Sequence, residues 1–257
     1  MTTEDMHVDD CRITNRRVAI DYEQTRRFFE DRAASDKDKI VQVLYQDENP
    51  ALAYARAHAE FDTLSRSVAF DGRAVLDIGC GNGRFAERLI DSVGYYFGFD
   101  LVAEFVETAK ASITGRGVCA SRYDFAVAPC NAEVVASIAS QRRFDVFLMS
   151  GVSIYLNDDD FLGTLTSIAA AMQPGSVLYL RDPIETRDDR LTLNRFMSRE
   201  LAAEYSVIYR GRADYLGIVG EVFDQSFRIG SLTPMYRDAS LAGQFSTQQH
   251  YILVSRT

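Results

Sequence analysis

The sequence is poor in the residues that build several common kinds of site. It has no tryptophan, and only three of its 257 residues are histidine. Its four cysteines include no C-x-x-C pair, so their spacing predicts neither a zinc site nor a disulfide framework. Free thiols are typical of a reducing compartment, and we expect a cytoplasmic protein. Long apolar runs are also missing, since none reaches the roughly 18 residues of a membrane helix.

The sequence also has fewer positively charged residues than acidic ones. The formal net charge is −9, and adjacent arginines occur only as Arg16–Arg17, Arg26–Arg27 and Arg142–Arg143. Binding of a phosphate backbone needs clustered Lys and Arg, so the composition argues against a nucleic-acid partner. The excess of acidic residues suits a cationic substrate such as an amine, and it also fits general solubility. The polar stretch Met1–Arg17 lacks the pattern of a signal peptide and is expected to be a tail.

The most informative stretch is Ala74–Gly83, which reads Ala-Val-Leu-Asp-Ile-Gly-Cys-Gly-Asn-Gly. A short apolar strand is followed by glycine at every second position, and a helix is expected from Phe85 to Ile90. Such a turn lets backbone N–H groups approach a ligand closely, because no Cβ stands in the way. The residues of this stretch that we expect at a ligand are Asp77, Gly79, Cys80, Gly81 and Gly83. Cys80 is expected to be a small residue that the turn tolerates, not a nucleophile.

Two residues argue against a dinucleotide in this turn. The dinucleotide fingerprint places its third glycine where Arg84 stands. Asp77 would repel a pyrophosphate, whereas a carboxylate suits a cationic ligand. The run Val75–Gly83 instead resembles motif I of the class I S-adenosylmethionine (SAM) methyltransferases, whose turn wraps the methionyl part of the cofactor. The resemblance implies SAM as cofactor and S-adenosylhomocysteine (SAH) as product.

The next strands extend the resemblance. Tyr96–Asp100 reads as a strand that ends in an acid, where a carboxylate can accept hydrogen bonds from both ribose hydroxyls. Cys119–Phe125 reads as the third strand, and the family often places an acid there for the adenine amino group beside an apolar residue that covers the ring. The resemblance thus assigns to the nucleoside Asp100, Leu101, Tyr123, Asp124 and Phe125. After the strand Phe144–Met149, Ser150 and Gly151 resemble motif IV, beside the reactive methyl.

Alternation of helix and strand predicts an α/β protein with a parallel sheet. The resemblance implies a Rossmann-like sheet of seven strands in the order 3-2-1-4-5-7-6, with strand 7 antiparallel, and a lid of N-terminal helices. We expect a tail and lid over 1–70, a SAM-binding domain over 71–257, and an acceptor-binding insertion near 183–225. Further elements predicted outside the motifs are helices over Asp21–Ala34, Ala51–Phe70, Val102–Thr114, Ala132–Ser140, Phe196–Tyr205 and Ala213–Phe223, a link over Leu44–Pro50, and strands over Val177–Leu180, Ser226–Leu232 and Tyr251–Ser255.

Methyl transfer from a sulfonium is an in-line displacement, so positioning and exclusion of water matter most. With so few histidines, we favour Asp182 and Tyr155 as groups that touch the acceptor, although Asp182 precedes a proline and can simply fix a turn. Arg195 can hold a substrate carboxylate or phosphate, or pair with a nearby acid. The substrate residues expected are Tyr22, Tyr45, Glu185, Arg195, Tyr236 and His250. Asp158–Asp160 suits the positive start of a helix, and no metal site is predicted.

The segment from Arg181 to Ile184, with Arg190 and Tyr209–Arg210, resembles methyltransferases of natural-product and sugar pathways. The expected partner is a small polar molecule, and the expected reaction is N-methylation of an aminosugar, an aminocyclitol or an antibiotic intermediate. O-methylation of a sugar or phenolic hydroxyl is the alternative, and a non-catalytic SAM-binding regulator is an alternative of another class. We expect a monomer or a homodimer without a nucleic-acid or membrane partner.

Overall fold

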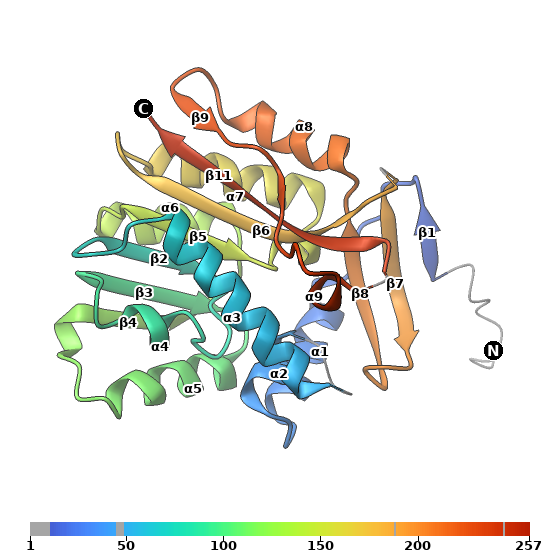
Figure 1. Cartoon of the computed structure of the whole chain (residues 1–257), viewed down its shortest axis with the longest axis horizontal. Coiled ribbons are helices and arrows are strands. Elements are labelled where there is room, and N and C mark those ends of the chain that lie inside the picture. The colour runs from blue at the N-terminus through green and yellow to red at the C-terminus, as the bar shows by residue number, and fades with distance from the viewer. Residues whose placement is uncertain (1–10, 45–48, 188, 244) are drawn as a thin grey trace.

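The computed structural model describes residues 11–44, 49–187, 189–243 and 245–257. These residues form a central sheet of eight strands and a separate sheet of three. Figure 1 shows the small sheet beside one end of the large one. The cavity described below lies where the two sheets meet.

The central sheet has the order β10-β11-β6-β5-β2-β3-β4, and β9 pairs with β11. Its parallel strands are β2 (Ala74–Ile78), β3 (Tyr95–Asp100), β4 (Tyr123–Val127), β5 (Val146–Ser150) and β6 (Val177–Glu185). Its antiparallel strands are β9 (Phe227–Ile229), β10 (Thr233–Pro234) and β11 (Thr247–Arg256). The expected single strand over Ser226–Leu232 is therefore wrong in its bounds, because two short strands share the edge of β11.

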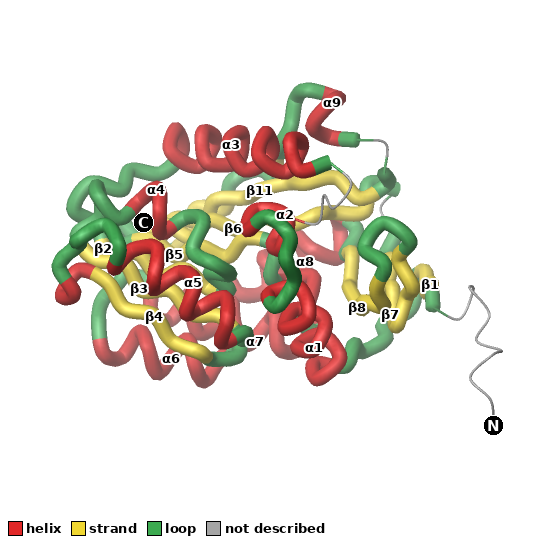
Figure 2. The backbone as a smooth tube through the Cα atoms, turned by 90° about the horizontal axis from the view of Figure 1, so that it is seen from below, coloured by secondary structure: helices red, strands yellow, loops and turns green. Residues whose placement is uncertain are grey.

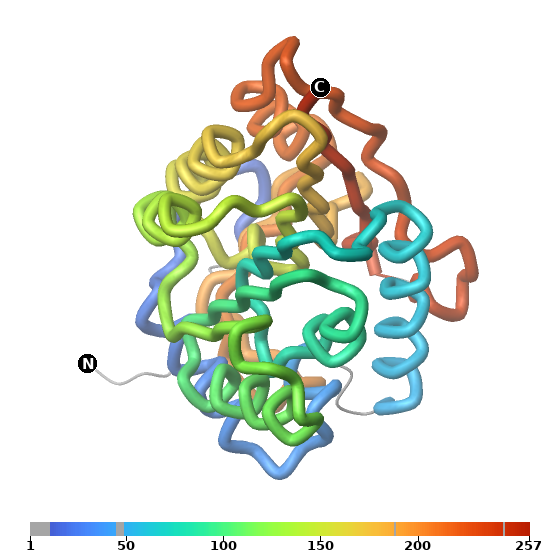
Figure 3. The backbone as a smooth tube through the Cα atoms, turned by 90° about the vertical axis from the view of Figure 1, so that its left-hand side faces the viewer, coloured from blue at the N-terminus to red at the C-terminus, as the bar shows by residue number. Residues whose placement is uncertain are grey.

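Helices cover both faces of this sheet, as Figures 2 and 3 show. One face packs against α3 (Pro50–Ser67), α4 (Ala86–Leu89) and α5 (Ala103–Thr114). The other face packs against α6 (Ala132–Gln141), α7 (Asp158–Ala171) and α8 (Arg212–Val222). Because successive side chains of a strand point to opposite faces, each strand contributes to both cores. None of the helices described in this chain is both long and apolar enough to cross a membrane.

The small sheet has the order β1-β7-β8, formed by β1 (Arg12–Thr14), β7 (Leu191–Ser198) and β8 (Ala203–Tyr209). Two expectations are wrong here. The segment Met1–Arg17 is not wholly a tail, since β1 pairs with β7. Phe196–Tyr205 is not a helix but the end of a hairpin. Strand β7 reaches Ser198 and β8 begins at Ala203, and Ala202 in the turn between them adopts a φ of 49°. The helix-forming residues around Glu200 are overruled by tertiary packing, because Phe196 and Tyr205 pack together at the base of the hairpin.

Helix α1 (Tyr22–Ala33) lies against β8, with the rings of Phe28 and Tyr205 at 5.8 Å. Helix α2 (Lys39–Leu44) follows, and the sequence does not predict it. At the start of α3 the Asn49 side chain accepts a hydrogen bond from the Leu52 amide, and Pro50 is the first residue of the helix. The N-terminal helices thus reach the carboxyl ends of the parallel strands (Figure 1).

Candidate active site

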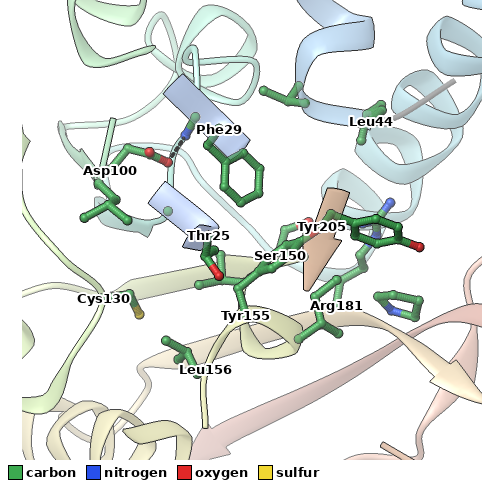
Figure 4. Close-up of a pocket in the computed structure, with 18 of the residues that line it drawn as sticks. Thr25, Phe29, Leu44, Asp100, Cys130, Ser150, Tyr155, Leu156, Arg181 and Tyr205 are labelled. Atoms are coloured by element: carbon green, nitrogen blue, oxygen red, sulfur yellow. Dashed lines mark hydrogen bonds between the residues drawn. The ribbon is translucent and has the colours of Figure 1, made fainter. Parts of the chain in front are cut away.

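A cavity of about 910 Å³ lies at the carboxyl ends of the parallel strands. It extends from the glycine turn after β2 to the helix α1 and the hairpin β7–β8. Figure 4 shows residues from these distant segments around the same space, among them Asp100, Phe29 and Arg181. In open α/β sheets ligands bind at this edge, and here α1 and the hairpin close part of it.

The glycine turn is shaped as the sequence indicated. Gly79 has a φ of 70°, and a Cβ there would lie 2.4 Å from a methyl group of Val152. The Gly81 amide donates to Oδ2 of Asp100 at 2.8 Å, which joins the turn to the end of β3. Gly83 has another role, because a Cβ there would lie 2.7 Å from Cβ of Ala109 on α5. Gly83 is thus needed for helix packing and is absent from the cavity wall.

Two carboxyl groups and a thiol line this part of the cavity. Asp77 is 2% exposed and accepts a hydrogen bond from the Tyr96 hydroxyl, and burial raises its pKa to about 7. Asp100 accepts from the Val102 amide at 3.0 Å, and burial raises its pKa as well. Burial also raises the pKa of Cys80 well above its usual value, so this thiol is not activated.

The adenine residues were expected at the wrong end of their strand. Strand β4 continues to Val127, so Asp124 is an exposed residue near its beginning. Phe125 packs against Tyr96 at 5.8 Å, and the Tyr123 hydroxyl lies 3.0 Å from that of Thr114. None of the three expected residues lines the cavity. The residues there are Ala128, Pro129, Cys130 and Asn131, with Leu101 from the β3 edge.

A buried ionic cluster forms the wall beside Ser150, and we call it the Glu60 cluster (Glu60, Arg84, Ser150 and Arg181). Glu60, from α3, is fully buried and lies 3.0 Å from Arg84 and 3.3 Å from Arg181. The Ser150 hydroxyl donates to Glu60 at 2.6 Å and accepts from Arg84 at 3.0 Å. Burial acts to raise the pKa of Glu60, but the two guanidinium groups outweigh it and hold that pKa below its usual value.

The far end of the cavity is lined by rings and aliphatic side chains. Phe29 meets Tyr155 edge to face with ring centroids 4.9 Å apart, and both line the cavity. The hairpin adds apolar side chains on the facing side, so most of this part of the wall carries no charge. We call these residues the aromatic compartment: Phe29, Ile154, Tyr155, Leu191, Leu193, Phe196, Tyr205 and Tyr209.

Alternation along the strands places two expected residues away from the cavity. Asp182 and His250 are register partners on β6 and β11 and point to the α8 face, whereas Arg181 and Pro183 line the cavity. Asp182 is fully buried and accepts a hydrogen bond from the Tyr215 hydroxyl at 2.8 Å. The prediction that Asp182 and His250 contact the acceptor is therefore wrong, because their strands turn these side chains to the other face.

The remaining expected substrate residues are distributed as follows. Tyr22 lines the cavity and bonds to Asp160 of α7, whereas Tyr45 lies outside the described residues. Glu185 is bonded to Arg187 and Ser246 behind the wall. Arg195 points along the outside of the hairpin, where it lies 3.5 Å from Glu204. Tyr236 is buried behind Arg181 and, like Glu185 and Arg195, does not line the cavity.

The acidic triplet at the start of α7 takes part in long-range contacts. Asp158 binds Arg190 and Arg210 at 3.0 and 2.8 Å, and so ties the small sheet to the end of β5. Arg210 also donates to the carbonyls of Ser153 and Leu156. These bonds fix the segment that carries Tyr155. No group of His, Cys, Asp and Glu with the makings of a metal site occurs within the described ranges.

Sequence reasoning missed Glu60, Arg56 and the hairpin side of the aromatic compartment. Glu60 is an acid on the buried side of α3, and its position on the apolar face of an otherwise amphipathic helix is the signal that marks it. The hairpin residues carry no such local signal, because their position depends on the pairing of β7 with β1.

Comparison with known proteins places this geometry in context. Residues 75–175 match the family described as a methyltransferase domain. The ubiquinone biosynthesis O-methyltransferase of Cereibacter sphaeroides is 31% identical over 121 residues, which are 47% of this chain and 45% of the relative. The chain therefore spans less than half the length of that curated relative.

Two solved structures share the fold. Phosphoethanolamine N-methyltransferase 1 of Haemonchus contortus, bound to phosphoethanolamine and SAH, superposes with a TM-score of 0.65 over 91% of this chain and 49% of that one, at 14% identity. The N-methyltransferase NodS of Bradyrhizobium japonicum, bound to SAH, gives 0.60 over 91% and 98% of the two chains, at 16% identity. At such identities these likenesses concern the fold.

Proposed function

We propose that this chain, whose residues 75–175 match the methyltransferase domain family, is a SAM-dependent enzyme. It would transfer a methyl group to a small acceptor held between α1 and the hairpin β7–β8. One observation carries the proposal. A single cavity joins the glycine turn and Asp100 to the aromatic compartment. Such a cavity has room for a cofactor at one end and an acceptor at the other.

The residues at the turn fit SAM. Gly79 and Gly81 leave the backbone open where a side chain would stand, and both line the cavity. Each oxygen of Asp100 accepts one backbone amide, which leaves further lone pairs for ribose hydroxyls. Asp77 faces the same space, and a buried carboxyl gains most when a cationic group lies beside it. We assign Asp77 to the ammonium or the sulfonium of the cofactor.

The acceptor part of the site works by positioning. SAM supplies an electrophilic methyl group, so the chain must hold a lone pair in line with it and keep water out. Phe29, Tyr155 and Tyr205 offer flat surfaces against which a planar or apolar body can stack. Tyr155 also brings a hydroxyl to this compartment, and we keep it as an acceptor contact.

These walls favour an oxygen acceptor, and they favour a phenolic hydroxyl more than a sugar hydroxyl. Beside Ser150 the cavity wall carries the guanidinium groups of Arg84 and Arg181, which share the carboxylate of Glu60. A guanidinium stabilises an oxygen that loses its proton and repels a protonated amine. O-methylation of a hydroxyl on a planar body is therefore the function that the geometry supports best.

N-methylation of an amine stays as the second candidate, in the form of an aminosugar, an aminocyclitol or an antibiotic intermediate. Its specific support is the pair of acids at the cavity edge, Asp160 and Glu200, which can accept protons from an amine. An amine has to be presented neutral before it can attack, and a nearby carboxylate can take its proton.

The test has two stages. Calorimetric titration with SAM, SAH and NAD checks the cofactor, and we expect saturable binding of SAM and SAH without binding of NAD. The protein is then incubated with SAM and two matched panels, phenols and the corresponding anilines or aminosugars, and products are read by the mass of one added methylene unit. Methylation of phenols alone supports the first candidate, and of amines alone the second. SAH binding without turnover on any acceptor would point to a non-catalytic SAM-binding regulator.

A further inference from the structure

We propose that Arg181 forms an anion-binding subsite for the acceptor, which takes a carboxylate or a phosphate group carried by the acceptor's planar or apolar body. This inference rests on the proposed function and deepens it. Arg181 is the central residue of β6 and pairs in register with Ser150 at the end of β5. It lines the cavity, and Figure 4 shows the two side chains from neighbouring strands.

The first support is that one donor of the Arg181 guanidinium, Nε, is unmet within the described residues. The residue is 6% exposed, and its ion pair within 4.0 Å is with Glu60, at 3.3 Å through one nitrogen. Its Nε finds no hydrogen-bond acceptor in the described part of the chain. A guanidinium carries five N–H donors in a fixed fork, and a buried donor without an acceptor is costly. Nη1 lies 3.4 Å from the place where a Cβ on Gly151 would stand, so the fork reaches the cavity wall.

The second support is an excess of positive charge. Arg84 and Arg181 share the carboxylate of Glu60. Arg56 also lines the cavity, and it donates hydrogen bonds to the carbonyls of Leu241 and Ala242, which carry no charge. Burial and the proximity of Arg181 act to lower the pKa of Arg56, with the hydroxyl of Tyr236 acting against them.

Acids on the other side of the cavity do not remove this excess. Asp77 lies near enough to Arg84 to feel its charge, but burial raises the pKa of Asp77 to about 7, so it is partly neutral near that pH. Glu200 is exposed on the hairpin, and its charge acts to raise the pKa of Arg56. An anion bound at Arg181 would complete the charge balance of a wall that the chain leaves positive.

The third support is the position of Arg181 across the sheet. The cofactor residues Asp77 and Asp100 belong to β2 and β3, whereas β6 lies on the opposite side of β2, beyond β5. Strands are spaced by about 4.8 Å, so β6 stands roughly 10 Å from β2. The cofactor's own carboxylate is better placed for Arg84, which follows the turn directly. Arg181 is left for the acceptor, next to the aromatic compartment.

The test uses the whole chain saturated with SAH and probes of one shape. Benzoate and phenyl phosphate carry a charge, and benzamide is the neutral counterpart of benzoate. We expect calorimetry to show at least about tenfold tighter binding of one of the anions than of benzamide, the size of effect that charge-assisted hydrogen bonds give. Arg181→Met is expected to abolish this preference while the SAH affinity stays within about twofold.

Two further variants separate the effect of the charge of Arg181 from that of its planar fork and from the general effect of losing an arginine. Arg181→Lys keeps the charge but loses the planar fork, and is expected to retain part of the preference. Arg228→Met makes the same change as Arg181→Met at an exposed position on β9 outside the cavity, and should leave every affinity as it is. Unchanged SAH binding by Arg181→Met also shows that the variant is folded.

The outcomes that oppose the proposal are distinct. If wild-type protein binds SAH but binds benzamide as well as both anions, or binds none of them, the subsite is refuted and the proposed function stands. If Arg181→Met loses SAH affinity and keeps the anion preference, Arg181 serves the cofactor's carboxylate, which also refutes the acceptor subsite. If wild-type protein binds no SAH, the proposed function itself fails, and the subsite fails with it.

Discussion

The two ends of the cavity differ in charge and in where their residues come from. The end that we assign to the cofactor (the cofactor end) presents Asp77 and Asp100, from neighbouring strands within one contiguous stretch of the chain. The acceptor end presents Arg181 and aromatic rings from α1, η2 (Ser153–Tyr155) and the hairpin. A cationic cofactor would face the carboxyl groups of Asp77 and Asp100, and an acceptor that carries negative charge would face Arg181. The contrast indicates that one cavity can sort two ligands by electrostatics before any detailed fit.

The largest effect on the free energy of unfolding is expected from Glu60, the acid that pairs with both arginines of the Glu60 cluster. Glu60→Leu leaves Arg84 and Arg181 buried without their shared carboxylate. We expect a loss of about 3–5 kcal/mol in the free energy of unfolding, because a broken buried ion pair leaves uncompensated charge. Urea denaturation measures it.

The matched control is Glu107→Leu on the exposed side of α5. We expect it to change the free energy of unfolding by no more than about 0.5 kcal/mol. Equal effects of the two variants would mean that the Glu60 cluster does not stabilise the acceptor end.

The next effect concerns Asp77 and pH. Because its folded pKa is about 7, above the value of about 3.9 in an unfolded chain, the folded state holds a proton that the unfolded state has lost between these values. The contribution of Asp77 to the free energy of unfolding of the wild-type protein therefore falls as pH rises from 5 to 7, by about 1 kcal/mol per pH unit. Asp77→Asn cannot ionise, so its advantage over wild type should grow with pH in denaturation experiments without ligand. Parallel pH profiles of the two proteins would contradict the assignment.

A smaller effect is expected for the ribose contact. Asp100→Ala should weaken SAH binding by roughly 1–3 kcal/mol, because a charge-assisted pair is lost. Calorimetry measures the affinity. Asp124→Ala is the control, since Asp124 lies exposed near the start of β4. Unchanged affinity of Asp100→Ala, or an equal loss in Asp124→Ala, would place the nucleoside elsewhere.

The smallest effect is expected at Arg195, which the sequence suggested as an anion contact. Its pairing with Glu204 is exposed, and exposed pairs contribute about 0–1 kcal/mol. Arg195→Ala should change neither anion binding nor the free energy of unfolding by more than about 0.5 kcal/mol. A strong loss of benzoate or phenyl phosphate binding would move the anion site from β6 to the hairpin.

The same contrast explains what the sequence could predict. The glycine turn and Asp100 are read from contiguous residues whose local geometry serves the site directly. Asp124 was misplaced because β4 ends two residues later than its apolar pattern indicates. Asp182 was misplaced because neither the register of β6 nor the face that it turns to the cavity is encoded next to it.

The acceptor end depends on contacts between remote segments. Glu60 meets Arg181 across more than a hundred residues of sequence, and no local pattern pairs them. Residues from Phe196 to Tyr205 favour a helix by propensity, yet the chain forms a hairpin there, because β1 pairs with β7 and α1 covers β8. Propensity is a weak predictor where tertiary partners decide.

The pairing of β1 with β7 also bears on how the chain is assembled. Arg12 faces Leu193 in this sheet, so the first described strand must await a partner made much later in synthesis. Contacts of such large sequence separation form slowly, because a long loop has to close first. Residues 75–175, which match the methyltransferase domain family, are synthesised before β7. We therefore expect the small sheet to close the cavity late in folding, after the segment that carries the glycine turn has been made.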